Sequence, residues 1–253
     1  MTDQTGRRAA LVTGASYGIG AATAVGLAQD GFDLVVTDLR PEDLADTVGK
    51  IGAAGARGVP IALDLTSHES IGEAFRAAVA AFGHLDVLVN NAAVPSLGRS
   101  AVDITRAEWD AVLAVNLTGT FFMTQQMGRY LIGAGRPGAI ISLASTHGVV
   151  GFAGASAYGI AKAAVSHMAK MLAIEWAEHG IRVNAIAPGT TETKSRAPRL
   201  ADPQHRRRML GRIPAGRFGT AEEMAAAIRY LASPQASYVT GHTLILDGGL
   251  TAG

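Results

Sequence analysis

The chain has 253 residues, of which 48% are hydrophobic and 17% are charged, and its formal net charge is +1. This balance is typical of a globular protein with a large core, and it gives no electrostatic basis for nucleic acid or an anionic membrane as the main partner. Cysteine is absent, which excludes disulfides, thiolate catalysis and cysteine-based metal sites. Without a recognisable signal peptide or membrane span, we expect a cytoplasmic protein that holds no metal.

Short β-branched runs alternate with longer segments of helical periodicity. Strands are expected at 9–13, 33–38, 58–63, 85–90, 138–143, 181–187 and 242–247, and helices at 19–30, 67–82, 105–134, 155–179 and 220–232. This alternation predicts an α/β fold in which one domain spans 1–253. We expect a doubly wound parallel sheet (Rossmann fold) of about seven strands with helices on both faces. The strands lack polar alternation, as expected when both faces are buried.

A glycine-rich segment, "LVTGASYGIGAAT" (11–23), follows the first strand and opens the first helix. Gly14, Gly18 and Gly20 would permit a tight turn and a close approach of the backbone to a pyrophosphate. The helix N-terminus would then offer free N–H groups to the anion. Glycines also serve ordinary turns, and it is the position directly after the first strand that favours a phosphate-binding role.

Two aspartates end successive strands on the edge of the sheet where the glycine turn lies. Asp38 ends the second expected strand and Asp64 ends the third. An acid at this place can accept hydrogen bonds from the ribose hydroxyls of a bound adenosine. The alternative is that Asp38 serves a turn or caps a helix, a role that the segment "DLRPED" (38–43), with its Pro41, would also suit. The two positions together favour a nucleotide site.

A tyrosine stands four residues before a lysine in the small-residue segment "AYGIAKAAVSH" (157–167). Positions four apart share one face of a helix, so Tyr158 and Lys162 are expected to project together. Taken alone, the pair is explained better by an ordinary surface contact, with the ring lying on the lysine stem.

The segment 188–219 is long, apparently irregular and rich in Thr, Arg, Pro and Gly. A loop of this length in a compact domain is usually functional or mobile, and we expect 190–215 to form a lid over the site. Its basic run, Arg206 to Arg208 flanked by His205 and Arg212, is interpreted as a solvated surface.

Seven motifs in a fixed order resemble the short-chain dehydrogenase/reductase family. They are T-G-x-x-x-G-x-G at 13–20, Asp64, "NNAA" at 90–93, Asn116 in "VNLTG", Ser145 in "SLAST", Tyr158-x-x-x-Lys162 and "PGTTET" at 188–193. The resemblance runs from about Ala9 to Gly249 and is to the 3-oxoacyl reductase and sugar-alcohol dehydrogenase-like branch. One departure is Ala93, where the family more often has glycine.

The resemblance implies an NAD-dependent oxidoreductase that interconverts a secondary alcohol and its ketone. Tyr158 would be the general acid/base, and Lys162 would favour its phenolate, which otherwise forms only near pH 10. Lys162 would also hold the nicotinamide ribose, and Ser145 would orient the substrate oxygen. Asn116 would interrupt a helix and hold a water that links Lys162 to solvent.

The resemblance also implies a set of cofactor-binding residues. Those expected to contact NAD are Gly14, Ser16, Tyr17, Gly18, Ile19, Gly20, Asp38, Asp64, Leu65, Asn91, Ala92, Ala93, Tyr158, Lys162, Pro188, Gly189, Thr191 and Thr193. Asn91 to Ala93 would line the adenosine and its ribose, and 188–193 would fix the nicotinamide amide. Asp38 favours NAD over NADP, because its carboxylate would repel a 2′-phosphate. Arg40 would favour NADP, because its guanidinium could partly neutralise that phosphate.

The substrate pocket is expected to be built from 94–99, 146–154 and 190–215, with His147 as a wall or loop residue. These segments suit a sugar, a cyclic alcohol or a hydroxy acid equally well. The alternatives are a 3-oxoacyl-thioester (acyl carrier protein) reductase, which usually uses NADPH, and a non-catalytic dinucleotide sensor. The presence of both Tyr158 and Lys162 disfavours the sensor.

The helical segment 105–130 carries more apolar residues than one core face needs, which implies a second buried surface. These residues are Trp109, Val112, Leu113, Val115, Leu117, Phe121, Phe122 and Met123. The final strand, "HTLILDGG", offers another at the sheet edge. Because relatives are commonly tetramers with two-fold interfaces, we expect a homotetramer, with a dimer as the next choice.

Overall fold

A computed structural model describes residues 6–194, 197 and 201–252 of the chain. Seven strands in this part form one parallel sheet in the order β3-β2-β1-β4-β5-β6-β7, which confirms the predicted doubly wound α/β fold. The strands are β1 (Arg8–Thr13), β2 (Phe32–Asp38), β3 (Gly58–Ala62), β4 (Val87–Asn90), β5 (Gly138–Leu143), β6 (Ile181–Pro188) and β7 (Thr243–Leu246). Each predicted strand is present, with bounds shifted by at most two residues.

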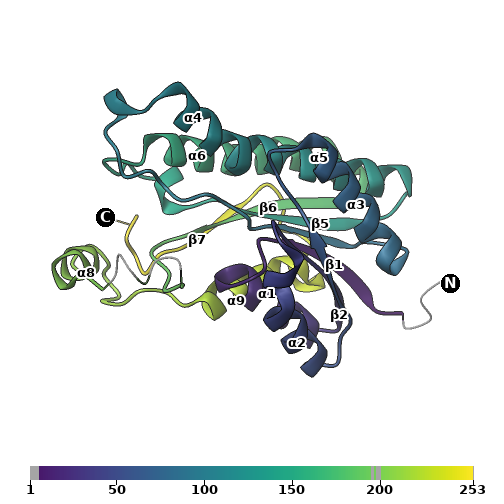
Figure 1. Cartoon of the computed structure of the whole chain (residues 1–253). Helices are drawn as coiled ribbons and strands as arrows, with labels where there is room; N and C mark the ends of the chain where they lie inside the picture. The colour runs from purple at the N-terminus through teal and green to yellow at the C-terminus, as the bar shows by residue number, and fades with distance from the viewer. Residues whose placement is uncertain (1–5, 195–196, 198–200, 253) are drawn as a thin grey trace.

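Helices cover both faces of the sheet (Figure 1). On one face lie α3 (His68–Phe82), α4 (Arg106–Leu113), α5 (Thr120–Gly133) and α6 (Ser156–Trp176). On the other face lie α1 (Gly18–Gln29), α2 (Ala45–Ala53) and α9 (Ala221–Ala232). Each layer has its own buried apolar cluster, one around Leu88 and Met127 and the other around Leu27 and Val89. The strands between them are buried on both sides, which is why they read as continuous apolar runs.

The expected helix 105–134 is present as α4, a π-helical segment at Ala114–Gly119 and α5. One prediction of local structure was wrong. The expected irregular stretch 188–219 contains a helix, α8 (Pro203–Leu210), with Asp202 as its N-cap. The Asp202 side chain accepts from Gln204 N, and Pro203 follows at the first helical position. Asp followed by Pro is a sequence signature of a helix start. The expectation of an irregular stretch rested on its Thr, Arg, Pro and Gly content and did not use this signature.

The sheet order places the functional residues at one edge. Connections run in opposite directions from β1 and from β4, so a crevice opens between these strands at their carboxyl ends. The glycine turn follows β1, Asp38 ends β2, and Ser145 follows β5. Residues far apart in sequence therefore meet at this edge.

Candidate functional site

A cavity of about 770 Å³ opens at the carboxyl ends of the strands. Most of the predicted site residues line it: Gly14, Tyr17, Gly18, Ile19, Asp38, Asp64, Leu65, Asn91, Ala92, Ala93, Ser145, Tyr158, Lys162, Pro188, Gly189, Thr191 and Thr193. Ser16, Gly20 and Asn116 do not line the cavity, but each lies against a residue that does. The cavity crosses the sheet from the ends of β2 and β3 to the ends of β5 and β6.

The three glycines of the turn after β1 are required for different reasons. Gly14 and Gly18 have φ of +65° and +62°, a conformation that favours glycine. A Cβ on Gly20 would lie 2.3 Å from the Gly14 carbonyl oxygen, so only glycine fits. Tyr17 precedes α1 without a capping side-chain hydrogen bond, which leaves the N–H groups of the first turn available to an anion.

Asn91 ties the glycine turn to β4. Its Nδ2 donates to the carbonyl oxygens of Thr13 at 2.9 Å and of Gly14 at 2.7 Å. The Thr13 hydroxyl in turn accepts from the backbone N–H groups of Asn91 and Ala92, both at 3.0 Å. The Asn91 amide nitrogen therefore holds the shape of the turn.

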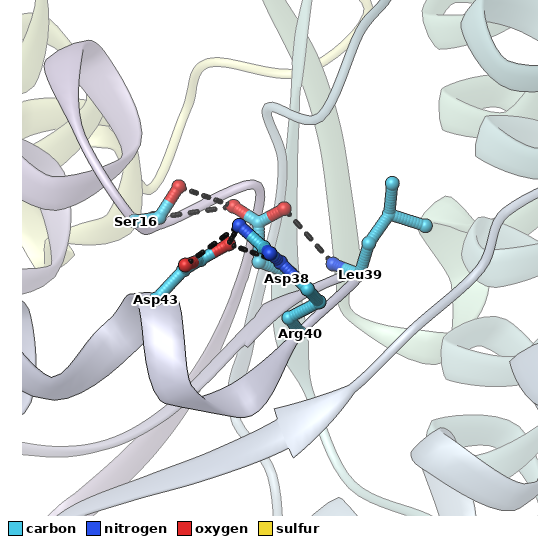
Figure 2. Close-up of polar contacts among 5 residues, drawn as sticks. All are labelled: Ser16, Asp38, Leu39, Arg40 and Asp43. Carbon is cyan, nitrogen blue, oxygen red and sulfur yellow. Dashed lines mark hydrogen bonds and ion pairs between the residues drawn. The ribbon is translucent and has the colours of Figure 1, made fainter.

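Asp38 is held at the end of β2 with its carboxylate against the glycine turn (Figure 2). Oδ2 accepts from the Ser16 hydroxyl at 2.5 Å and from Ser16 N at 3.3 Å, and Oδ1 accepts from Leu39 N at 2.9 Å. Arg40 is directed to Asp43 instead, with Nε and Nη2 donating to its carboxylate at 2.9 and 3.0 Å. Two N–H donors on one carboxylate orient the Arg40 guanidinium.

Asp64 makes local turn contacts and also lies on the cavity wall. Its Oδ1 accepts from Thr66 N at 2.8 Å and from the Thr66 hydroxyl at 2.7 Å, which is a turn role. Asp64 also lines the cavity, and Leu65 beside it is buried.

Tyr158 and Lys162 lie on α6 and both line the cavity, as their spacing predicted. Lys162 is 3% exposed, and its Nζ donates to the Leu143 carbonyl oxygen at 2.6 Å. The same Nζ lies 5.8 Å from the centre of the Tyr158 ring. Burial lowers the pKa of Lys162 to about 8, because removal from water disfavours the charged form.

Ser145 and His147 complete this side of the cavity. Ser145 is buried after β5, and its Oγ accepts from His147 N at 3.2 Å and lies 3.3 Å from His147 Nδ1. The imidazole stacks on Phe152, with centroids 4.1 Å apart, and meets Tyr158 edge-on at 5.6 Å. The expected wall role of His147 agrees with these contacts.

Asn116 lies in the π-helical segment and is fully buried. Its Oδ1 accepts from Val94 N at 2.9 Å, and its Nδ2 donates to the Val94 carbonyl oxygen at 3.0 Å. The predicted helix interruption is confirmed. The side chain is hydrogen-bonded to both backbone polar groups of Val94, which lies on the cavity wall.

The segment after β6 closes the cavity from the side of α9. A Cβ on Gly189 would lie 2.8 Å from the Cα of Asp247, so the strand end packs closely on the C-terminal segment. The Thr193 side chain lies against Gly18 of the glycine turn, 3.3 Å from where its Cβ would be. Thr191 pairs with Gly219 as an isolated bridge.

The arginines of the basic run are exposed, as expected of a solvated surface, and part of the run also lines the cavity. His205, Arg208 and Met209 of α8, together with Arg212, line the same cavity as Tyr158. Arg206 does remain outside the lining and pairs with Glu192 at 3.1 Å. The sequence carried one signal for this arrangement, because Asp202 followed by Pro203 marks the start of the helix that carries His205, Arg208 and Met209.

In the part of the chain that the structure describes, no group of three or more His, Asp or Glu side chains is placed to hold a metal ion. No helix in it is long and apolar enough to cross a membrane.

Comparisons with known proteins agree with this geometry. A family model described as enoyl-(acyl carrier protein) reductase matches residues 14–251. The chain is 39% identical to 3β-hydroxysteroid dehydrogenase 1 of Eggerthella lenta, over 99% of this chain and 96% of that protein. It is 37% identical to 2-dehydro-3-deoxy-D-gluconate 5-dehydrogenase of Escherichia coli K12, over 97% and 96% of the two chains.

Solved structures resemble the whole fold. A short-chain alcohol dehydrogenase from Sinorhizobium meliloti 1021 superimposes with a TM-score of 0.94 at 42% identity, covering 99% of this chain and 98% of the other. A 2-deoxy-D-gluconate 3-dehydrogenase from Agrobacterium tumefaciens, which holds NADP, gives 0.90 at 38% identity and 97% coverage of both chains.

Proposed function

The chain belongs to the short-chain dehydrogenase/reductase family, and from this premise we propose that it is an NAD(H)-dependent enzyme that interconverts a secondary alcohol and its ketone. Its relatives are dehydrogenases that act on CH–OH groups, so the chain is an oxidoreductase of that kind. The observation that carries the proposal is that Tyr158, Lys162 and Ser145 line one cavity with the glycine turn.

The glycine turn fits a dinucleotide. Gly14 and Gly18 line the cavity without side chains, and the first turn of α1 offers uncapped N–H groups to a pyrophosphate. Asp38 would accept hydrogen bonds from the adenosine ribose in place of its contact with Ser16. Bound NAD supplies the hydride acceptor or donor, while the protein supplies position and electrostatics.

The residues beside the reacting carbon divide the remaining work. Tyr158 gives a proton to the carbonyl oxygen in reduction and takes it back in oxidation. The Lys162 ammonium favours the phenolate form of Tyr158 and holds the nicotinamide ribose. Ser145 turns its hydroxyl to the substrate oxygen, and Asn116 is a positioning residue that fixes the wall at Val94.

A 3-oxoacyl-thioester reductase is the second candidate, because the chain is also 40% identical to the 3-oxoacyl-[acyl-carrier-protein] reductase of Thermotoga maritima. The substrates named for the two curated relatives are a steroid and a sugar acid, so the family leaves the substrate class open. The test is reduction of a ketone panel with NADH, including β-keto thioesters. Turnover of ketones supports the proposal, and binding of NAD without turnover of any panel member would favour the sensor.

We also propose that 1–253 acts as one domain and that 190–215, including α8, forms a lid over the substrate. Residues 195–196 and 198–200 of this segment lie outside the described part of the chain. His205, Arg208 and Met209 lie on the cavity wall although α8 projects beyond the sheet (Figure 1). A lid on this helix would exclude water from the reacting carbon when it closes.

We predict a clear preference for NAD over NADP, because a 2′-phosphate would come close to Asp38. Two unit charges about 4 Å apart repel by roughly 4 kcal/mol at an effective dielectric near 20, and halving this for solvent still leaves at least about tenfold discrimination. Arg40 offers little relief because Asp43 holds its guanidinium. The measurement is kcat/KM for both cofactors with one ketone.

Two isosteric variants separate the contributions of these residues. Asp38→Asn should erode the preference by removing the charge, whereas Asp43→Asn removes an equal charge nearby and releases Arg40. If Asp43→Asn improves NADP use more than Asp38→Asn does, Arg40 governs the site. The NADP held by the Agrobacterium relative makes this an informative comparison. Equal kcat/KM values in the unmodified enzyme would contradict the prediction.

We propose that the chain forms a homotetramer. A groove of about 470 Å³ on α5 and α6 is lined largely by apolar residues, including Leu117, Phe121 and Met171. Ile174 on the same helix as Met171 is 79% exposed, and Ile245 lies exposed on the edge strand β7. Apolar surface of this extent marks interfaces, and closed symmetry would cover both patches.

Light scattering at micromolar concentration is expected to give four times the 26.0 kDa mass of the chain. Met171→Asp should lower this mass, because a carboxylate would be buried without a partner. Val102→Asp is the matched control, since Val102 is 90% exposed and lies outside the groove. A monomeric mass for the unmodified protein would refute the assembly.

A further inference from the structure

The cavity carries opposite charges at its two sides. The acidic residues that line it, Asp38 and Asp64, follow β2 and β3 on the side assigned to the adenosine. Its arginines, Arg208 and Arg212, come from α8 and the turn after it. Among the described residues that line the cavity there is no other aspartate and no glutamate. The side away from the adenosine therefore has a positive field.

A stack of rings links Arg212 to the reacting end of the cavity. The Arg212 guanidinium carbon lies 4.7 Å from the centre of the Phe152 ring. Phe152 stacks on His147, which meets Tyr158 edge-on. Arg212 is thus on the substrate side of Tyr158. Stacking fixes the plane of the guanidinium through its face and leaves the N–H groups on its edge free for a ligand.

The charges of these two arginines are not neutralised within the part of the chain that the structure describes. Arg208 donates to His205 Nδ1 at 3.2 Å, and no described carboxylate lies within 4.0 Å of Arg208 or Arg212. Arg206, two positions before Arg208, differs from them, because it pairs with Glu192 and stacks on Phe218.

We propose that the substrate carries a carboxylate, remote from its reacting carbon, that Arg208 and Arg212 bind. This inference rests on the proposed alcohol–ketone chemistry and names its substrate class as hydroxy and oxo acids. A guanidinium presents two parallel N–H donors that match a carboxylate, and hydrogen bonds between charged partners are about twice as strong as neutral ones. Both arginines are exposed and hydrated in the free protein, and a neutral sugar, sterol or thioester would make no use of their charges.

The test compares ketones that differ only in charge. The probes are 4-oxocyclohexanecarboxylate against its carboxamide and 4-oxopentanoate against its amide, each reduced with NADH at constant ionic strength. The acid of each pair is expected to have a kcat/KM at least about tenfold higher, as one charged hydrogen-bonded pair typically provides. A β-keto N-acetylcysteamine thioester is measured beside them.

Three substitutions on the lid assign the effect to residues. Arg208→Gln and Arg212→Gln should each lower kcat/KM for the acid about tenfold, mainly through KM, and should change the amide far less. Arg207→Gln is the matched control: it removes the same charge from the same helix, but Arg207 does not line the cavity. It should leave the ratio of acid to amide unchanged.

The outcomes separate this inference from the proposed function. If the amide or the thioester is reduced with the same kcat/KM as the acid, the alcohol–ketone chemistry stands and the carboxylate site is overturned. The site is also overturned if Arg207→Gln lowers kcat/KM for the acid as much as Arg208→Gln does. A third contrary result is that Arg208→Gln raises only the KM for NADH. If no probe is reduced, calorimetry of cyclohexanecarboxylate and its carboxamide with the NAD complex decides. Binding of the acid that Arg212→Gln abolishes supports the site, and equal affinities refute it.

Discussion

Replacement of Tyr158 by phenylalanine is expected to lower kcat for ketone reduction by roughly 10²–10⁴-fold, the range typical of a positioned general acid/base. Only the hydroxyl is lost, and the ring retains its edge-on contact with His147. The fold and the affinity for NAD should therefore persist. Single-turnover kinetics with saturating NADH and a cofactor titration measure the two quantities separately.

Tyr238→Phe is the matched control, because Tyr238 is fully exposed and its hydroxyl lies outside the cavity. This variant should retain full activity. Near-wild-type turnover of Tyr158→Phe would show that the proton comes from elsewhere, and His147, which lies 3.3 Å from the Ser145 hydroxyl, would be the next residue to test.

Replacement of Lys162 by methionine is expected to abolish most activity and yet stabilise the cofactor-free protein. Loss of a preorganised charge beside the reacting group typically costs on the order of 10²–10³-fold in rate. Burial lowers the pKa of Lys162 from 10.5 to about 8, which corresponds to about 3 kcal/mol of unfavourable free energy in the charged native state. The Leu143 carbonyl loses its donor in the variant, at about 1–2 kcal/mol, so the net gain at neutral pH is about 1–2 kcal/mol.

The gain should depend on pH in a defined direction. Below about pH 8, Lys162 is charged in both states and its penalty is fully present. Between about 8 and 10.5 the unfolded chain binds more protons than the native one, so the free energy of unfolding of the unmodified protein rises with pH. The advantage of Lys162→Met therefore shrinks across this window. Urea unfolding at several pH values measures it at fixed protein concentration.

Lys170→Met is the matched control, because Lys170 lies on the same helix and is exposed. It should change neither activity nor the pH dependence of stability. A loss of stability in Lys162→Met at pH 7, or a gain that is the same at pH 7 and pH 10, would contradict the burial of a charged ammonium.

Some features of the site follow from short-range sequence patterns alone. The interval of four residues puts Tyr158 and Lys162 on one helix face, and the glycines after β1 mark a turn that side chains would block. The seven strands and their common edge follow from the alternation of apolar runs with helical segments, because parallel strands need crossover helices. These patterns act between neighbours in the chain, so the chain alone is sufficient to reveal them.

Other features were decided only by tertiary structure. The pairing of Arg40 with Asp43, the clasp of Asn116 on Val94 and the burial of Lys162 against Leu143 depend on which segments pack together. The sequence showed a basic run near 206 but not that Arg208 faces the cavity, because α8 had first to be placed at the mouth of the cavity. Local patterns determine which elements form and which residues they can present. The depth at which a charge is buried, and the partner it meets, are set by packing between segments far apart in the chain, which composition and spacing do not encode.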